Sequence, residues 1–307
     1  MIDPIMRRVP LAAYQPLRRL VFAVGRGNPL RVAATMVLRR AARAHHGHLA
    51  ARLSEIRPID RPDLSFEPVD SMVIDAVYWL GVRGYEGIAA RVWTELCAEA
   101  DAVLEIGGNV GLFAVIGATA TRGTYTVVEP VPQVAATLRK NLARNGLARV
   151  EVLQAAVVAG EAMRDVVMNL PAEGRAMPVG AHLLDAVEVA PRASDGRITV
   201  RGWPISGLAA GRDLIKIDAE GIEATLIGNI RAMLLRDRPT LMVEVLPEAT
   251  RLAALLSELA AEAGYRIHVL PAYGSDRVVT VEAADFTAAT PATHHSKDVV
   301  LSVRDLR

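Results

Sequence analysis

Four carboxylates stand where apolar runs of the sequence end. They are Glu105, Glu129, Asp218 and Glu244, and Glu220 follows shortly after the third. A carboxylate can bind a cation or take a proton from a hydroxyl. Placing its charge near a hydrophobic core costs free energy unless the carboxylate is solvated or hydrogen-bonded. Ligands of open α/β sheets bind outside the carboxyl ends of the strands. These residues therefore indicate a site, although Asp218 or Glu220 could instead cap the helix that starts near Gly221.

A glycine turn follows the first of these runs. Residues 102–106 are apolar apart from Glu105, and Gly107-x-Asn109-x-Gly111 comes next. Glycine permits a tight turn with close approach of the backbone to a ligand, and the helix that follows aims free N–H groups at the turn. Glu129 comes 22 residues after Gly107, near the spacing at which a carboxylate reaches a ribose diol. This pattern indicates a nucleoside-type cofactor.

Two residues of this turn distinguish between cofactors. A dinucleotide site needs G-x-G-x-x-G so that the backbone can approach a pyrophosphate, and here Asn109 takes the second glycine position. Glu105 would repel a diphosphate but suits a ligand that carries an ammonium group. Both residues favour S-adenosylmethionine over NAD. Two alternatives stay open at this point: an NAD-dependent dehydrogenase on a similar fold, and a non-catalytic scaffold in a biosynthetic complex.

The wider sequence predicts an α/β protein. The 307 residues are 51% hydrophobic and 22% charged, which is typical of a globular protein with a full core, and the single Cys97 fits a reducing compartment. Strand and helix patterns alternate from Ala102, so we predict a doubly wound, Rossmann-like sheet, mostly parallel with an antiparallel edge strand. We expect two helices over 70–99, and further helices from Asn109, over 131–144, after Gly221 and up to Gly264. The expected strands cover residues 102–106, 124–129, 150–157, 213–218, 240–245, 265–270 and 298–303.

The N-terminal part of the chain has a different composition. We predict a basic helical extension with a proline-rich connector over residues 1–68, and a catalytic domain over 69–307 with a hairpin or lid insertion at 158–212. Residues 1–65 hold twelve Arg and only four acidic residues. This arm could touch an anionic membrane surface or a partner protein, or it could dock on the acidic remainder. No apolar run approaches the ~20 residues of a transmembrane helix, so we expect a cytoplasmic protein, with peripheral membrane contact left open.

The chain resembles the FkbM family of S-adenosylmethionine-dependent methyltransferases over about residues 70–305. The motifs that carry the resemblance are residues 104–111, Val128-Glu129-Pro130, residues 138–142 with Asn145-Gly146, and the most specific one, residues 215–223; Gly84-Tyr85-Glu86 and the 239–244 segment also fit. The chain departs from the family at two positions. Glu105 stands where the family usually has Asp, and Gly108 stands where it usually has Ala.

The resemblance implies an O-methyltransferase that acts on a hydroxyl of a sugar, glycan or natural-product small molecule, on a class I methyltransferase sheet. Glu105 and the loop from Gly107 to Gly111 would hold the methionine end of the cofactor, Glu129 the ribose hydroxyls, and residues 154–156 the adenine. The cofactor-binding residues expected in this way are Glu86, Glu105, Gly107, Gly108, Asn109, Gly111, Glu129, Pro130, Gln154, Ala155, Ala156 and Asp218.

Methyl transfer to an alcohol also needs a base within hydrogen-bond reach of the acceptor. We expect Asp218 to be that base or the ligand of an activating cation, with Glu220 and Glu244 as second candidates. Asp218 and Glu244 together could hold Mg²⁺, which prefers carboxylate oxygens, so metal dependence stays open. Aromatic residues make up 4% of the chain, which offers few stacking platforms for bases, and nucleic acid is not expected as a partner.

Overall fold

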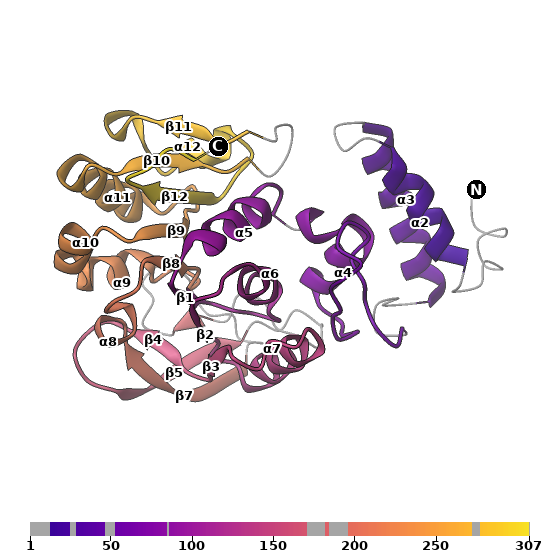
Figure 1. The fold of residues 1–307 in the computed structure, drawn as a ribbon, viewed down its shortest axis with the longest axis horizontal. Coiled ribbons are helices and arrows are strands. Elements are labelled where there is room, and N and C mark those ends of the chain that lie inside the picture. The colour runs from indigo at the N-terminus through magenta and orange to yellow at the C-terminus, as the bar shows by residue number, and fades with distance from the viewer. Residues whose placement is uncertain are drawn as a thin grey trace. The chain divides into compact units, whose positions relative to one another are not determined.

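The computed structural model describes residues 13–24, 29–46, 53–84, 86–170, 182–183, 196–271 and 277–306 (Figure 1). The chain divides into two compact units, the first within residues 1–85 and the second beginning at Glu86. This division lies after the domain boundary that we predict at residue 68. Tyr85 of the Gly84-Tyr85-Glu86 motif and residues 171–181 and 184–195 of the predicted insertion lie outside the described residues.

The first unit is helical. It contains α2 (Tyr14–Ala23), α3 (Pro29–His46), α4 (Met72–Leu80) and the short helix η3 (Val82–Gly84). Arg39 of α3 donates to Asp75 of α4 at 2.7 Å, and the rings of Tyr14 and Trp79 meet edge to face. These contacts tie α4 to the N-terminal helices. Within the described parts of the chain, no helix combines the length and the apolar character needed to cross a membrane.

The second unit is built on a mixed sheet of eight described strands. Its order is β11 (Val279–Val281), β10 (Arg266–Val269), β12 (Asp298–Ser302), β9 (Thr240–Glu244), β8 (Leu214–Ile217), β1 (Ala102–Ile106), β2 (Thr124–Val128) and β3 (Glu151–Leu153). Strands β9, β8, β1, β2 and β3 are parallel, which confirms the doubly wound prediction. The predicted antiparallel pair is β10 with β12. Strand β12 lies between β9 and β10, and β11 forms the edge.

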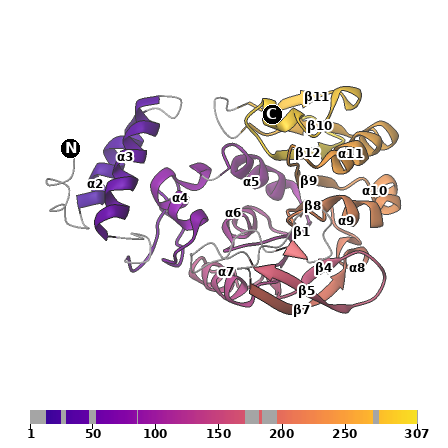
Figure 2. The same cartoon turned by 180° about the vertical axis from the view of Figure 1, so that it is seen from behind.

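Helices cover both faces of this sheet (Figures 1 and 2). Helices α5 (Ala89–Glu99), α6 (Leu112–Ala120) and α7 (Pro132–Arg144) lie on one face, and α9 (Glu223–Asn229), α10 (Arg231–Asp237) and α11 (Thr250–Ala263) lie on the other. Side chains of a strand alternate between the two faces. Leu104 and Ile106 therefore pack into the core under α9–α11, whereas Glu105 and its register partner Lys216 face α5 and α6.

Three predicted elements differ from the structure. The helix expected from Asn109 begins at Leu112, because Asn109 (φ 47°) and Gly111 (φ 90°) have left-handed backbone conformations that a helix cannot include. The helix expected after Gly221 is divided into α9 and α10 by Ile230. The strand expected over 150–157 is two short strands, because Gln154 and Ala155 leave β3 and the chain joins a second sheet.

That second sheet fills the described part of the predicted insertion. Its order is β4 (Ala156–Val158), β7 (Gly196–Pro204), β5 (Arg164–Leu170) and β6 (His182–Leu183), and the short helix α8 (Ile205–Ala209) returns the chain to β8. Strands β5 and β7 are antiparallel over seven residue pairs and lie within the segment for which we predict a hairpin or lid. Residues Ala156, Met168 and Val200 form its small core.

Candidate functional site

The glycine turn after β1 lies against the end of β8. The N–H groups of Gly107 and Gly108 both donate to the carbonyl of Val128, at 3.0 and 3.1 Å. Gly107 has φ 83°, and a Cβ there would lie 1.9 Å from the backbone oxygen of Asp218. A Cβ at Gly108 would lie 2.3 Å from Cγ2 of Val127. Packing therefore requires glycine at Gly107 and explains why glycine rather than alanine occupies position 108.

The turn also fixes Glu129 at the end of β2. The N–H groups of Asn109 and Val131 donate to the two carboxylate oxygens of Glu129, each at 2.9 Å. The side-chain oxygen of Asn109 accepts from the N–H of Val110 at 2.7 Å. Burial raises the pKa of Glu129 to about 7, although these N–H groups oppose the shift. Glu129 is thus held beside the glycine turn by two backbone N–H groups. The side chain of Asn109 occupies the position that a second glycine takes in a dinucleotide site.

Glu105 lies one position before the end of β1 and is buried. The hydroxyl of Tyr125 donates to its Oε2 at 2.5 Å. Burial raises the pKa of Glu105 to about 7, whereas the charge of Lys216 and the bond from Tyr125 lower it. The carboxylate therefore has a protein partner beneath the turn. One of its two oxygens is thus bonded within the protein, and its contact with the methionine end of the cofactor stays a prediction.

Lys216 is buried beside Glu105 and forms an ion pair with Asp218. Its Nζ lies 2.8 Å from Oδ2 of Asp218 and 4.9 Å from the centre of the Phe113 ring. Burial disfavours the ammonium, but the attraction of Asp218, Glu86 and Glu105 is stronger and raises the pKa of Lys216 above its ordinary value. Burial likewise disfavours the ionised form of Asp218. The positive charges of Lys216 and Lys297 favour it more strongly, so the pKa of Asp218 is lowered.

A second lysine connects the ends of the next strands. Nζ of Lys297 bonds to Oε1 of Glu244 at the end of β9 and lies 3.3 Å from Oε1 of Glu86. Glu86 is 5% exposed, and its other oxygen, Oε2, is buried without a hydrogen-bond partner among the described residues. Asp298, the register partner of Glu244, is also buried here. Glu86 and Glu244, which we predict as site residues, are thus brought together.

Glu220 differs from the other carboxylates of the cluster. It has a left-handed backbone conformation (φ 54°), which is rare for a residue other than glycine. No described residue forms a hydrogen bond or ion pair with its side chain. Burial raises the pKa of Glu220 to about 8, and the charges of Asp218 and Glu244 add to this effect. The strained turn therefore presents a carboxylate that gains or loses its proton near neutral pH.

The turn around Glu220 is held by Glu223. The carboxylate of Glu223 accepts from the N–H of Ala219 at 2.8 Å and from the N–H of Gly221 at 3.1 Å. The residue at the N-cap of α9 is Ile222, which makes no side-chain cap. Neither Asp218 nor Glu220 is therefore the helix cap that the sequence left open as an alternative.

The remaining predicted cofactor residues lie at the end of β3. Leu153 pairs with Val128, and its carbonyl accepts from the N–H of Glu129 at 3.0 Å, so residues 154–156 follow directly beside the end of β2. Gln154 is exposed, whereas Ala155 and Ala156 are buried, and Pro130 is half-buried. The structure thus brings Glu129 and Gln154 to the ends of neighbouring strands, and their contacts with an adenosine stay predictions.

Three residues of this cluster were not predicted as site residues: Lys216, Lys297 and Asp298. A lysine within the apolar run Ile215-Lys216-Ile217 was a usable signal, because a charged residue is rarely buried without a partner. Lys297 and Asp298 carry no comparable signal. They reach the site only because β12 enters the sheet beside β9.

The charges of the cluster are unbalanced. Lys216 and Lys297 stand among six carboxylates, those of Glu86, Glu105, Asp218, Glu220, Glu244 and Asp298. Burial, together with the negative charge of Asp218, raises the pKa of Glu220 and Glu244. A cationic ligand beside them would favour their ionised forms. No group of three or more His, Cys, Asp or Glu in the described residues is arranged to hold a metal ion.

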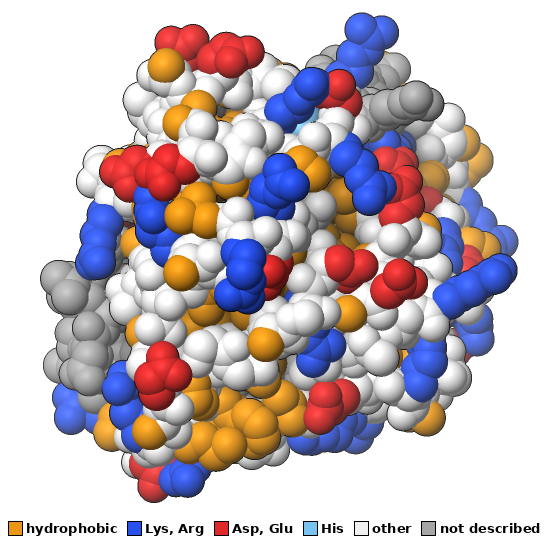
Figure 3. All heavy atoms as spheres, turned by 60° about the vertical axis from the view of Figure 1, so that its left-hand side comes forward, with side chains coloured by type: hydrophobic (Ala, Val, Ile, Leu, Met, Phe, Trp, Pro, Cys, Tyr) orange, Lys and Arg blue, Asp and Glu red, His pale blue; other side chains and the backbone are white. Residues whose placement is uncertain are grey.

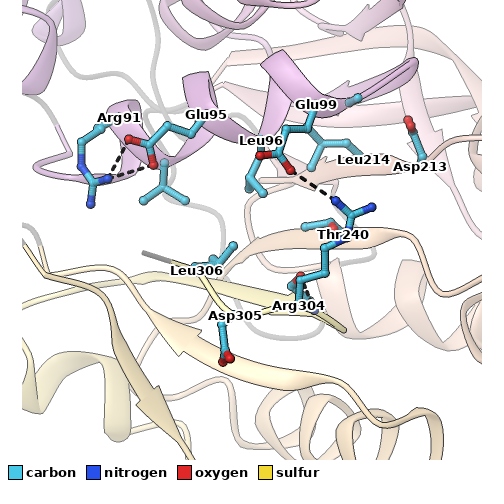
Figure 4. Close-up of a pocket in the computed structure, with 13 residues that line it drawn as sticks. Arg91, Glu95, Leu96, Glu99, Asp213, Leu214, Thr240, Arg304, Asp305 and Leu306 are labelled. Carbon is cyan, nitrogen blue, oxygen red and sulfur yellow. Dashed lines mark hydrogen bonds and ion pairs between the residues drawn. The ribbon is translucent and has the colours of Figure 1, made fainter.

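A cavity of about 740 Å³ lies at the opposite end of the sheet (Figure 4). Its walls come from α5, from the starts of β8 and β9, and from the residues that follow β12. Two pairs of its charged side chains form ion pairs across or along its wall, Arg91 with Glu95 and Arg304 with Glu99. This cavity is separate from the carboxylate cluster at the carboxyl ends of the strands.

Comparison with known proteins identifies the family. The FkbM methyltransferase domain matches residues 105–267, which is more than half of the chain. No curated protein matches. Among solved structures, the methyltransferase FkbM from Methylobacillus flagellatus is 17% identical over 66% of this chain and 44% of its own, with a TM-score of 0.41. The aligned region thus spans less than half of that protein.

Two further solved structures cover almost the whole chain. An O-methyltransferase from Bacillus cereus in complex with SAH is 11% identical over 96% of this chain and 100% of its own, with a TM-score of 0.40. The SAH-bound methyltransferase PaMTH1 from Podospora anserina is 12% identical over 96% of each chain, also with a TM-score of 0.40. The assignment rests on the domain match: the chain belongs to the FkbM family of S-adenosylmethionine-dependent methyltransferases.

Proposed function

We propose that this protein transfers a methyl group from S-adenosylmethionine to a hydroxyl of a sugar, glycan or natural-product small molecule, and that Glu220 is the general base. The observation that carries this proposal is the Glu220 carboxylate itself, which has no partner among the described residues and has a pKa raised to about 8 at the carboxyl ends of the strands. A base is most effective when its pKa lies near the working pH.

The residues of the site fit the cofactor. Bound S-adenosylmethionine supplies an electrophilic methyl group on a cationic sulfonium, together with an ammonium group. Oε2 of Glu86 is a buried acceptor without a donor among the described residues. Glycine at position 107 lets the turn pack directly against the backbone of Asp218 at the end of β8. In this proposal Glu86 and the turn hold the methionine end, and Glu129 accepts from the ribose hydroxyls.

Asp218 has a different role in this proposal from the one expected of it. Its carboxylate is bound by Lys216 and its pKa is lowered, so it accepts a proton poorly. We assign it to orientation of the acceptor, through a carboxylate oxygen that accepts from a hydroxyl. Glu220 lies two residues further along the same turn and can take the proton that the acceptor loses.

Mg²⁺ at Asp218 and Glu244 is less well supported than the base mechanism. Each of these carboxylates is bound by a lysine ammonium, Asp218 by Lys216 and Glu244 by Lys297. A divalent cation between them would have to displace or repel both ammonium groups. We therefore assign Lys216 and Lys297 the charge-balancing role that a metal ion would otherwise have.

Isotope-labelled S-adenosylmethionine offered with a panel of monosaccharides, glycans and hydroxylated natural products tests the acceptor class. With an acceptor in hand, kcat should rise with pH to a plateau above about pH 8, because Glu220 must be ionised to act as a base. Glu220→Gln should lose about 10²-fold or more in kcat and retain cofactor binding by calorimetry. The exposed Glu248→Gln is the matched control.

The outcomes separate the parts of the proposal. Absence of S-adenosylmethionine binding by the wild-type protein would refute the activity as a whole. Cofactor binding together with a Glu220→Gln variant that keeps the wild-type rate and pH profile would refute only the base. A loss of activity in the wild-type protein on chelation, restored by Mg²⁺, would instead favour the metal-assisted mechanism.

A further inference from the structure

Helices α2 and α3 expose apolar side chains to an unusual extent. The four most exposed large apolar side chains of the described residues all lie on them: Leu20 (69%), Leu30 (71%), Met36 (65%) and Val37 (50%). On α3 the exposed positions Leu30, Ala33, Val37 and Arg40 recur at steps of three and four residues, which is one face of a helix. The exposed face of α3 is therefore an apolar stripe with an arginine at its end.

The inward faces of the same helices carry arginine. Arg18 of α2 is buried over the Tyr78 ring, 4.1 Å from its centre, and donates to the carbonyl of Tyr78 at 2.5 Å. Arg31 of α3 is buried over the Phe22 ring at 4.0 Å. These contacts hold the helices in an orientation opposite to that of an ordinary surface helix, which buries its apolar stripe and exposes its charges. The packing of α2 and α3 therefore leaves Met36 and Val37 exposed.

The charge of this region indicates what the stripe contacts. No Asp or Glu occurs between Asp3 and Glu55, and this interval contains ten Arg. On the face of the molecule drawn in Figure 3, by contrast, Lys and Arg side chains are interspersed with Asp and Glu. An acid-free, arginine-rich segment is complementary to a surface of continuous negative charge.

One kind of surface matches both features. The leaflet of a membrane that contains anionic lipids offers negative headgroups for Arg19 and Arg40, which are exposed, and an apolar layer directly beneath for Leu20, Met36 and Val37. A nucleic acid offers the negative charge but no apolar layer. We propose that α2 and α3 dock this protein peripherally on an anionic membrane, with the apolar stripe inserted among the lipids and the arginines at the headgroups.

Flotation of the full-length protein with vesicles tests this proposal. We expect binding to phosphatidylcholine vesicles that contain phosphatidylglycerol, and little binding to phosphatidylcholine alone. Met36→Ser with Val37→Ser should weaken binding about tenfold or more, because two inserted apolar side chains are lost. Arg19→Gln with Arg40→Gln should weaken it several-fold and reduce its dependence on salt. Met163→Ser, at an exposed position of the second unit, is the matched control.

Several outcomes would overturn the proposal. One is equal binding to neutral and anionic vesicles, and another is no binding to either. Binding that duplex DNA competes away and that the Met36 and Val37 substitutions leave unchanged would assign the arginines to a polyanion instead. All of these substitutions lie outside the cofactor site, so binding of S-adenosylmethionine by each variant checks that it is folded and keeps this test independent of the proposed activity.

Discussion

Removal of the Lys216 ammonium should destabilise the protein in a way that depends on pH. In Lys216→Met the apolar stem is kept, but Asp218 loses the partner that lies 2.8 Å away in the native structure. Removal of one partner of a buried ion pair costs about 3–5 kcal/mol. The Asp218 side chain is 21% exposed, so water compensates part of this cost, and we take the lower value, about 3 kcal/mol near pH 8.

The sign of the pH dependence follows from the neighbouring carboxylates. In the native protein Lys216 lowers the pKa of Asp218 and opposes the rise in the pKa of Glu105. Without it, we expect both folded-state pKa values to rise. Stability from groups with a raised folded pKa is present at low pH and is lost as pH rises through that pKa. The deficit of Lys216→Met should therefore be smallest below about pH 4, where the carboxyl groups are protonated, and largest near pH 8.

Thermal unfolding followed by tryptophan fluorescence measures this deficit, since Trp93 is buried in the same unit. A loss of about 3 kcal/mol corresponds to a fall in Tm of roughly 6–12 °C for a domain of this size. The double variant Lys216→Met with Asp218→Asn removes both charges, so it should recover much of the Tm at pH 8 without recovering activity. A single variant that melts with the wild type at pH 8, or a double variant no more stable than the single one, would refute the reasoning.

Three further results are expected. Gly107→Ala should weaken S-adenosylmethionine binding at least about tenfold and lower Tm, because position 107 has a left-handed backbone and the new Cβ would lie 1.9 Å from the backbone oxygen of Asp218. Calorimetry and thermal melting measure these effects, and unchanged affinity would contradict the prediction. Cofactor affinity should increase from pH 6 to pH 8, because Glu129, with a pKa of about 7, accepts hydrogen bonds from the ribose hydroxyls best when it is ionised. Glu129→Gln should remove this pH dependence, and a variant that keeps the wild-type dependence would exclude Glu129 as its source. Tyr125→Phe should lower the free energy of unfolding by about 1.5–3 kcal/mol at a pH where Glu105 is ionised, and it should raise the pKa of Glu105 further above 7. The loss of unfolding free energy should therefore grow from pH 6 to pH 8, and a loss that is constant with pH would contradict this prediction.

Local patterns predicted most of the sheet and its helices. Helix α7 follows from the spacing of Val134, Leu138 and Leu142 and from the Asn145-Gly146 end, and the structure places all of these as expected. Helix α11 ends at Gly264, which has the left-handed conformation that closes a helix. These elements were predictable because a buried face and a stop signal lie within one short stretch of sequence.

Other differences between the prediction and the structure depend on partners that are distant in the sequence. Residues 150–157 form a continuous β pattern, yet the chain leaves β2 after Leu153 because Ala156–Val158 pair with β7. The cluster around Glu244 was incomplete for the same reason, since Lys297 reaches it through the placement of β12. Glu105 is expected at the ligand because of its position in the motif, and this expectation stays a prediction. Its burial under the turn depends on Tyr125 of the neighbouring strand, which the motif does not contain.

The position of β12 has a consequence for the order in which the molecule assembles. This strand follows β10 in the sequence but lies between β9 and β10 in the sheet. A nascent chain that has emerged only as far as β10 therefore has to keep a gap beside β9, or open a temporary pairing there, before β12 can enter. Until that insertion, Glu86 and Glu244 lack the Lys297 counter-ion. We therefore expect the parallel-to-antiparallel junction between β9 and β12 and the charge balance of the site to be completed together, when β12 enters the sheet.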